Sequence, residues 1–241
     1  MVWHVVSLCV GSELVLVSPV KVVQTLFTVI FDPDFLKTVW YSAARILGGF
    51  FTALTLGTVL GWVASRFWVV ETLLRPITAV IKATPVASFI ILVLLWFSGK
   101  NLSVIISMLM VFPVIYMNVL EGIRSADEKL LEMAQVFRLS VGKKLLYIYL
   151  PAVAPFFVSA CSVSLGLCWK SGIAAEVIGT PDGSIGAVFY QAKIFLQTSE
   201  LLAWTVVVVA VSVAFEKLFM LLLRLVLKKL KMEDVLNGKR A

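Results

Sequence analysis

Charged residues are scarce in this chain. They make up 15% of its 241 residues, whereas an average soluble domain carries roughly 25%. Hydrophobic residues make up 61%, and several apolar runs reach about 20 residues, the length that a helix needs to cross a bilayer core of about 30 Å. The alternating segments of a membrane β-barrel are missing. The sequence therefore predicts an all-α fold, a polytopic transmembrane helical bundle.

Residues that commonly carry catalysis are also rare. His4 is the single histidine, which argues against a histidine zinc site or a Ser–His hydrolase. Cys9, Cys161 and Cys168 lie in apolar runs, so we interpret them as small packing residues. No GxxxxGK[ST] phosphate loop occurs in the sequence. We therefore expect no catalytic residue, metal or cofactor on this chain, and ATP hydrolysis on a partner chain. An intramembrane hydrolase would need a nucleophile–base pair or a metal cluster that these residues do not supply.

Five apolar core spans are predicted. They cover residues 36–64, 77–97, 102–120, 145–168 and 200–223. Gly57 and Gly61 form a small-xxx-small pair that lets another helix approach closely. Pro85 lies inside the second span and allows a kink there. Residues 65–75 are expected to form a loop.

The segment before the first core span is shorter than a span. Residues 2–17 are apolar but contain Gly11 and Glu13, so we expect either a truncated first helix or a segment at the membrane interface. Pro19 then permits a short amphipathic helix, which "DPD" at 32–34 stops. Three regions follow: 1–34 with a partial span and an interfacial helix, 35–225 with the transmembrane domain, and 226–241 with a basic cytoplasmic tail.

Lysine and arginine are unevenly distributed among the loops. Most of them lie in residues 65–75, in 121–144 and in the C-terminal tail, which alternation of the spans places on one side. Cytoplasmic loops carry an excess of Lys and Arg, so we expect these regions to be cytoplasmic. The net charge of +7 is therefore interpreted as an orientation signal, and no nucleic-acid partner is expected.

A polar insert at residues 121–144 separates two spans. Acidic residues at 127–128 open a helix with apolar residues near helical spacing, a break follows near 140–142, and a second helix starts. A helix this short is marginal in water alone. Two explanations stay open: a partner protein docks on this helix-turn-helix, or the helix lies on anionic lipid, helped by the lysine pair at 143–144.

The insert ends in the most specific pattern of the chain. Glu132 begins it, Ile-Tyr-Leu-Pro at 148–151 closes it, and nine residues separate Arg138 from Ile148. This spacing resembles the EAA loop of type I ABC importer membrane subunits: Glu-Ala-Ala, three residues, Gly, nine residues, Ile-x-Leu-Pro. Met133 stands at the first Ala and Arg138 where that family commonly has Gly. We therefore expect Gly142 to supply the flexible point of the turn.

Four further stretches are similar to the same family, in the same order. They are SAARILGGF at 42–50, ATPVASFIILVLLWFSGKN at 83–101, FPVIYMNVLEGIR at 112–124 and AAEVIG at 174–179. With the loop, they resemble the branch that transports nitrate, sulfonates, taurine and thiamine-precursor pyrimidines. Members of this family usually have a full helix before Ser18-Pro19, so we expect a truncated first helix or a misplaced start codon.

The resemblance implies a permease subunit that forms the pathway for a small polar solute, either a sulfonate-, taurine- or nitrate-like anion or a pyrimidine vitamin precursor. It implies four partners: cytoplasmic ATP-binding subunits, a second permease subunit expected to be an identical copy, an extracytoplasmic substrate-binding protein, and the lipid bilayer of a prokaryotic plasma membrane. The implied ATPase-coupling residues are Leu131, Glu132, Ala134, Gln135, Phe137, Arg138, Leu139 and Gly142. A stand-alone secondary carrier or channel is the alternative, and it predicts transport without ATP or a partner.

Polar residues on apolar spans are pathway candidates because they are costly in lipid. The candidates are Ser88, Ser107, Asn118, Ser162, Trp169 and Lys170. A serine that bonds its own helix backbone is the competing explanation, and Lys170 is equally explained as an interface cation. In the glycine-rich external loop expected at 169–186, Glu176 and Asp182 are candidates to contact the binding protein, and Glu176 could instead orient the loop.

Overall fold

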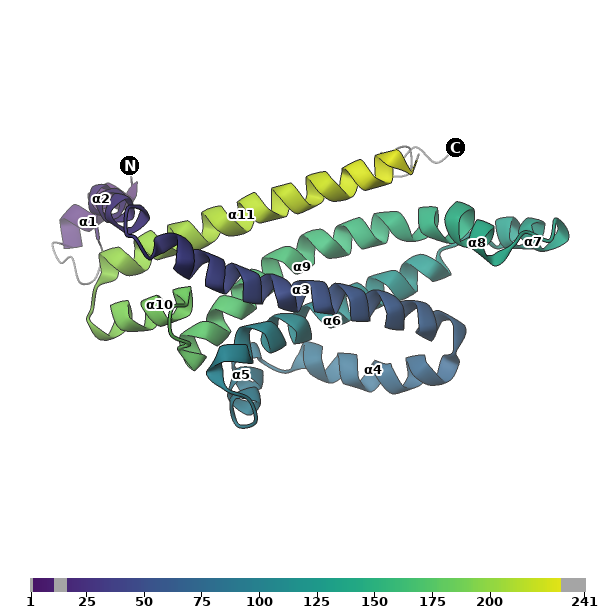
Figure 1. Cartoon of the computed structure of the whole chain (residues 1–241), viewed down its shortest axis with the longest axis horizontal. Coiled ribbons are helices and arrows are strands. Elements are labelled where there is room, and N and C mark those ends of the chain that lie inside the picture. The colour runs from purple at the N-terminus through teal and green to yellow at the C-terminus, as the bar shows by residue number, and fades with distance from the viewer. Residues whose placement is uncertain (1, 11–16, 231–241) are drawn as a thin grey trace. The chain divides into compact units, whose positions relative to one another are not determined.

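The chain is helical throughout most of the residues that the structure describes. The computed structural model describes residues 2–10 and 17–230, and they contain no β-strand (Figure 1). In chain order the elements are α1 (Val2–Val10), α2 (Pro19–Ile30), α3 (Phe35–Arg66), α4 (Trp68–Ala83), α5 (Val86–Leu94), α6 (Gly99–Arg124), α7 (Glu128–Val136), α8 (Val141–Lys144), the π-helical turn η1 (Leu145–Tyr149), α9 (Leu150–Gly179), α10 (Ile185–Ile194) and α11 (Thr198–Lys229). The predicted all-α fold is confirmed. Parts of the predicted N-terminal segment and tail, residues 1, 11–16 and 231–241, lie outside the described residues.

Four helical segments of the described chain are long and apolar enough to cross a bilayer. They are α3, α6, the run Val141–Gly179 and α11. Counted as one bent span, α4 and α5 make a fifth. These four or five segments agree with the five predicted core spans.

The predicted boundaries around α4 and α5 are wrong. Residues 65–75 do not form a loop, because α4 already begins at Trp68, and α4 and α5 meet at a bend of 105° instead of forming one span over 77–97. Thr84 has φ −82° and ψ 131°. The ring of Pro85 disfavours a helical conformation at the preceding residue and removes a backbone donor. The proline therefore breaks the span rather than kinking it.

The predicted external loop at 169–186 is also wrong in its first half, because α9 continues to Gly179. A glycine inside a helix costs only about 1 kcal/mol, and Gly172 is itself buried within α9. The helix stops where Thr180 takes a φ of 40°, just before Pro181. A further helix, α10, follows, with the Ser184 hydroxyl accepting from the Ala187 N–H at 3.0 Å.

Two compact units make up the chain. Unit 1 is Met1–Gly49, Val86–Ile106 and Trp169–Ala214, and unit 2 is Phe50–Pro85, Ser107–Cys168 and Phe215–Ala241. Each of α3, α6, α9 and α11 contributes residues to both units.

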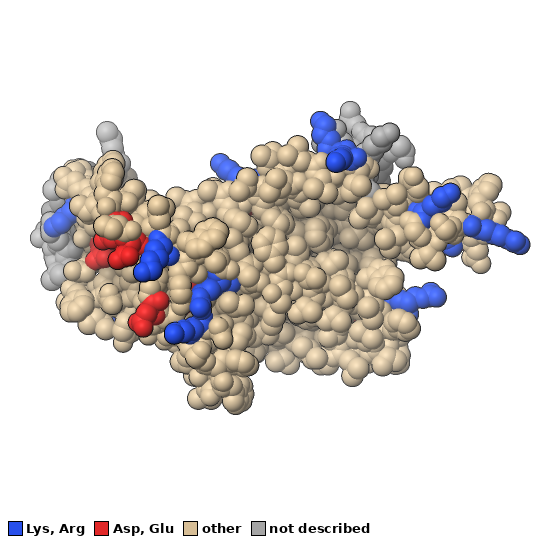
Figure 2. Space-filling model, in the orientation of Figure 1, with Lys and Arg blue, Asp and Glu red and all other residues tan. Residues whose placement is uncertain are grey.

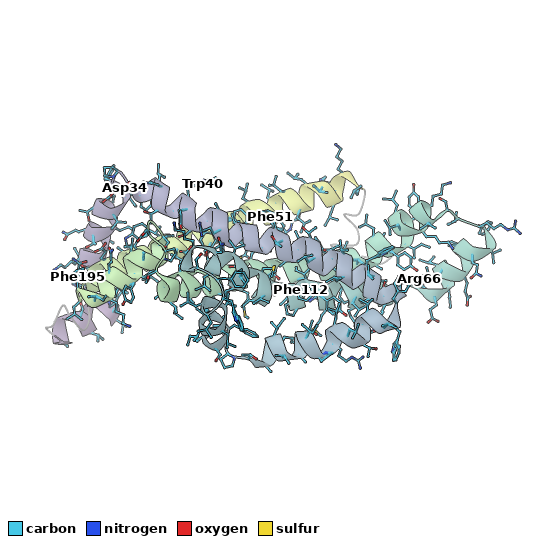
Figure 3. All side chains as sticks on the ribbon, turned by 60° about the horizontal axis from the view of Figure 1, so that its bottom comes forward. Asp34, Trp40, Phe51, Arg66, Phe112 and Phe195 are labelled. Atoms are coloured by element: carbon cyan, nitrogen blue, oxygen red, sulfur yellow. The ribbon has the colours of Figure 1, made fainter. Side chains whose placement is uncertain are left out.

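One core cluster of unit 1 forms where α2, α10 and α11 meet the start of α3. Val29, Ile185, Ala203, Trp204 and Val207 are buried there together. The ring of Phe35 packs on that of Trp204, with centroids 5.6 Å apart. Figure 3 shows Asp34 and Trp40 around the start of α3 and Arg66 at its other end.

In unit 2, α3 packs closely on α6, as the glycine pair predicts. A Cβ on Gly57 would lie 3.0 Å from the Ile115 side chain, and one on Gly61 would lie 3.0 Å from Val119. Next to this contact, the ring of Phe112, labelled in Figure 3, stacks on Tyr116 at a centroid distance of 5.8 Å. The two glycines therefore serve helix packing.

Gly61→Val is expected to destabilise the protein and Gly48→Val is not. Valine at 61 would press on the Tyr116 carbonyl, which lies 3.1 Å from the new Cβ, whereas a Cβ at 48 meets nothing within 4 Å. Overpacking of this kind costs about 1–3 kcal/mol. Thermal unfolding followed by tryptophan fluorescence in detergent should show a lower midpoint for Gly61→Val alone, and equal midpoints for both variants would contradict this packing.

Candidate functional site

The polar insert forms the helix, break and second helix that its sequence predicts. Asp127 caps α7, with its carboxylate accepting from the Lys129 N–H at 2.9 Å. The helix ends at Val136, and α8 begins at Val141 (Figure 1). Residues 128–144 are therefore held as a short helical loop between α6 and α9.

The turn that closes α7 explains the glycine of the EAA pattern. Arg138 has a φ of 49°, in the left-handed region that favours glycine. Its N–H donates to the Gln135 carbonyl at 3.0 Å, and the Leu139 N–H donates to the Ala134 carbonyl at 2.9 Å. This bonding is that of a Schellman motif, in which the residue after the cap is left-handed and usually glycine. The expectation that Gly142 supplies the flexible point is wrong, because Gly142 lies within α8 and the left-handed residue is Arg138 itself.

Arg138→Gly is expected to stabilise this turn. A non-glycine residue in the left-handed conformation costs about 1–2 kcal/mol, so glycine should slow amide exchange at Leu139, whose N–H closes the motif. Arg138→Val should accelerate the same exchange, since a β-branched residue tolerates this conformation poorly. Hydrogen exchange by mass spectrometry on the peptide that contains Leu139 measures both, and identical exchange in the two variants would refute the assignment.

One face of the α7–α8 loop packs on its own chain. Ala134 is completely buried, in a cluster with Ala126 and Ile148. Leu131 and Leu139 pack against the same cluster. These three of the eight implied coupling residues therefore anchor the loop to Ala126, two residues after α6 ends, and to η1.

The same loop also exposes apolar side chains. Val136, Phe137 and Val141 are 79%, 72% and 78% exposed, and Leu130 and Met133 are 42% and 47% exposed. We call these five residues the docking face. Over α7 and α8, Figure 2 shows Lys and Arg among uncharged residues.

Of the five members of the docking face, only Phe137 is among the eight implied coupling residues. The sequence signal for the exposed residues was the number of apolar residues on α7, because it is larger than one buried face of a short helix can hold. Of the remaining implied coupling residues, Glu132, Gln135, Arg138 and Gly142 are exposed.

An ion-pair network links α4 to the end of α6. Glu71, only 8% exposed, receives the Arg124 guanidinium at 2.5 Å and that of Arg75 at 3.5 Å. No local pattern in the sequence predicts this pairing, since Glu71 and Arg124 are 53 positions apart.

A second buried carboxylate lies in unit 1, where α3, α9 and α10 meet. The Ser42 hydroxyl donates to Glu176 Oε2 at 2.6 Å and accepts from the Ile185 N–H at 2.9 Å. The Gly186 N–H also donates to Glu176 Oε2, at 3.3 Å. The positive end of the α10 dipole favours a carboxylate at this place. Glu176 thus joins the N-terminus of α10 to α9 and, through Ser42, to α3.

This burial bears on the expected contact with a binding protein. The Glu176 side chain is 0% exposed, so it can act on a partner only through the turn that it orients. Asp182, in that turn, is exposed. The structure leaves Asp182 available at the surface and gives Glu176 an internal position.

The candidate pathway residues differ in their surroundings. Ser107 donates to the Cys168 carbonyl at 3.1 Å, and Asn118 donates to the Val114 carbonyl of its own helix at 2.8 Å. Ser162 donates to Glu216 on α11 at 3.0 Å. The other three are placed differently: Trp169 is 2% exposed with an unpaired indole N–H, and Ser88 and Lys170 are exposed.

Comparison with known proteins assigns the class. The family described as binding-protein-dependent transport system inner membrane component matches residues 53–232. The chain is 30% identical over 230 residues to a Bacillus subtilis (strain 168) protein that carries the name aliphatic sulfonates transport permease, covering 94% of this chain and 83% of the relative. It is 27% identical to the taurine transport system permease protein of Escherichia coli (strain K12), over 89% of this chain and 80% of the relative. It is 25% identical to the nitrate import permease protein of Synechococcus elongatus, over 84% and 83%.

The protein is thus a multi-pass membrane protein of the transport permease class, defined by its apolar helices and its matched core. It belongs to the family of binding-protein-dependent transport system inner membrane components and is the permease subunit of an ABC importer.

Proposed function

We propose that this permease imports a small oxyanion and that cytoplasmic ATPase subunits drive it by binding the docking face. The observation that carries the proposal is the exposure of five apolar side chains on one short loop of an importer subunit. Burying apolar surface is worth about 25 cal/mol per Å², and apolar anchors dominate the energy of protein interfaces. The exposed Glu132 and Arg138 would pair with charges at the rim of the same interface.

The inward face of the loop suggests how force would be transmitted. Because Ala134 and Leu139 pack on Ala126 and Ile148, a movement of α7 would be passed to the connection that follows α6 and to η1. ATPase closure would then change access to the pathway, and nucleotide chemistry would stay on the partner chain.

The remaining partners follow from the same proposal. The α7–α8 loop would face the cytoplasm of a prokaryotic cell, and a second copy of the permease would complete the pathway in the plasma membrane. An external binding protein would deliver the solute near the turn that contains the exposed Asp182. Sulfonate, taurine and nitrate appear in the names of the relatives. Nitrate and sulfonates are anions, and taurine carries a sulfonate group, so we favour an anion over a pyrimidine precursor.

Disulfide crosslinking tests the docking proposal. The full chain, with Cys9 replaced by serine, would carry Phe137→Cys and be purified from its native membrane with its partners. We expect a crosslink to a subunit whose sequence contains GxxxxGK[ST]. Ala134→Cys is the matched control, because residue 134 is completely buried in this chain and should give no crosslink. Equal crosslinking at both positions, or protection of Phe137→Cys by anionic vesicles alone, would favour a lipid-bound loop instead.

A further inference from the structure

A polar stripe runs along α4. Glu71, Arg75, Thr78 and Lys82 recur at spacings of four, three and four residues, which places them on one face of a helix. Arg75 and Lys82 are exposed, whereas Glu71 and Thr78 are buried. Leu73, Ile77 and Val80 lie between them in the sequence and are exposed. Together α4 and α5 are apolar enough for a broken span or a re-entrant loop, and charged residues in such segments usually mark a solute path.

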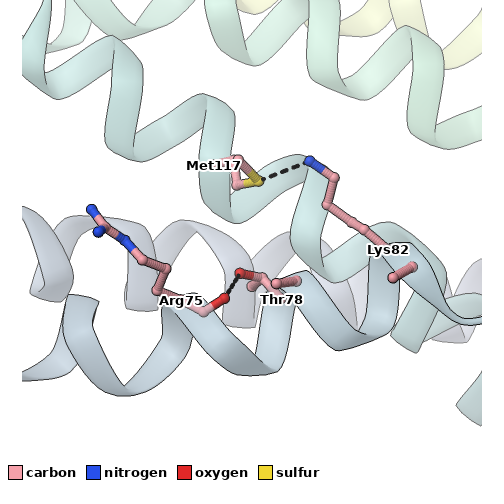
Figure 4. Close-up of a pocket in the computed structure, with 6 residues that line it drawn as sticks. Arg75, Thr78, Lys82 and Met117 are labelled. Atoms are coloured by element: carbon pink, nitrogen blue, oxygen red, sulfur yellow. Dashed lines mark hydrogen bonds between the residues drawn. The ribbon is translucent and has the colours of Figure 1, made fainter.

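The charges around this stripe do not cancel. Arg75, Lys82 and Arg124 face Glu71 and Glu121, all within or beside two pockets between α4 and α6, which leaves three cations against two carboxylates. Glu71 is already bonded to Arg124 and, more loosely, to Arg75. No carboxylate of the described residues lies within ion-pair distance of Lys82. Its ammonium instead approaches Met117 Sδ at 3.6 Å (Figure 4), and a thioether is a weak acceptor.

These side chains border an open pocket of about 370 Å³. Arg75, Thr78, Ala79, Lys82, Ala83 and Met117 line it. The two alanines leave room on the helix surface. Each water in the liquid takes about 30 Å³, so the space admits a small oxyanion with part of its water shell. Thr78 donates to the carbonyls of Leu74 and Arg75, so the two cations would provide the binding.

We propose that Arg75 and Lys82 hold a small singly charged oxyanion, and that this pocket is a transit site on the import pathway; the second part rests on the proposed function. Arg75 and Lys82 are seven positions apart on the helix, so their α-carbons are about 10 Å apart along its axis. Their long side chains can bridge this distance from both sides. The arginine fork suits two oxygens of one anion, and the lysine adds a mobile point charge. The site has one surplus positive charge, and the Arg75 side chain is 80% exposed. Both features favour weak binding of the anion, and a transported solute must be able to leave its site.

Binding of methanesulfonate to the full chain in zwitterionic-lipid nanodiscs tests the site. Affinity would be taken from the rise in unfolding temperature with methanesulfonate, against the same concentrations of gluconate, a bulkier anion. We expect Lys82→Gln to weaken binding at least tenfold and Lys82→Arg to retain it. Lys100→Gln removes an exposed cation at the start of α6, outside the pocket, and should leave binding unchanged. Wild-type binding in Lys82→Gln, or the same loss in Lys100→Gln, would overturn the site.

Two further experiments follow. The first asks whether the bound anion is a lipid headgroup, and the second tests the pocket independently of the proposed function. If nanodiscs with phosphatidylglycerol abolish the methanesulfonate effect, the pocket holds a lipid headgroup and the transit assignment is wrong. In the complete importer, Lys82→Gln should keep ATPase binding and lower the uptake of an alkanesulfonate at subsaturating concentration by about tenfold. Failure of wild-type protein to bind an ATPase would refute the proposed function, while the methanesulfonate result would still decide the pocket.

Discussion

Replacing Val136 and Phe137 together with aspartate is expected to reduce ATP-driven uptake to background while the permease stays in the membrane at its normal amount. Both side chains are more than 70% exposed, so the substitutions disturb no packing within the chain. In the complex they would remove two apolar anchors and bury two charges. A loss of about 3 kcal/mol, a hundredfold in affinity, is a conservative expectation. Copurification of the ATPase and solute uptake measure the effect.

The controls use the same loop. Ser140→Asp adds a negative charge at the cap of α8, where aspartate is favourable, and should leave uptake close to normal. Ala134→Asp should act differently, by lowering the amount of folded protein, because residue 134 is buried between Ala126 and Ile148. Normal uptake in the double variant would show that the docking face does not bind the ATPase.

Glu176→Ala is expected to cause the largest loss of stability. The change leaves Ser42 and the Gly186 N–H without their buried acceptor and opens a cavity where α3, α9 and α10 meet. Leaving a buried hydrogen-bonding group without its partner costs about 1–3 kcal/mol, and the cavity adds a further cost. Glu176→Gln keeps the shape and an acceptor oxygen, so it should retain most of that stability. Thermal unfolding of the purified chain separates the two variants.

Binding of the external protein gives a second test of the role of Glu176. If Glu176 orients the turn that contains Asp182, Glu176→Ala should weaken binding of the external protein even at temperatures where the chain is folded. Equal unfolding midpoints for alanine, glutamine and wild type would contradict the role assigned to this carboxylate.

Local sequence signals predicted much of this fold. Apolar run lengths located the spans, and the Gly57–Gly61 pair marked the contact of α3 with α6. The spacing of the EAA pattern marked the α7–α8 loop. The break at Pro85 was visible as a residue type, yet its size was underestimated, since the bend depends on the backbone of Thr84.

Features set by distant contacts could not be predicted in the same way. Which face of α7 is buried depends on Ile148, outside the helix. The Ser42–Glu176 bond joins residues 134 positions apart. Lys82 belongs to no local motif. It is a candidate anion ligand only because no carboxylate of the described residues lies beside it. Spacing along one helix is therefore informative here, whereas pairing between helices is not.

Uptake into sealed proteoliposomes tests the central claim most directly. The vesicles would contain the permease with its ATPase, with ATP enclosed on the ATPase side and the binding protein loaded with labelled taurine or an alkanesulfonate on the other. Accumulation should require both ATP and the binding protein, and should vanish in the Val136→Asp, Phe137→Asp variant. Entry of the solute at the same rate without nucleotide would contradict the account and identify a stand-alone carrier or channel.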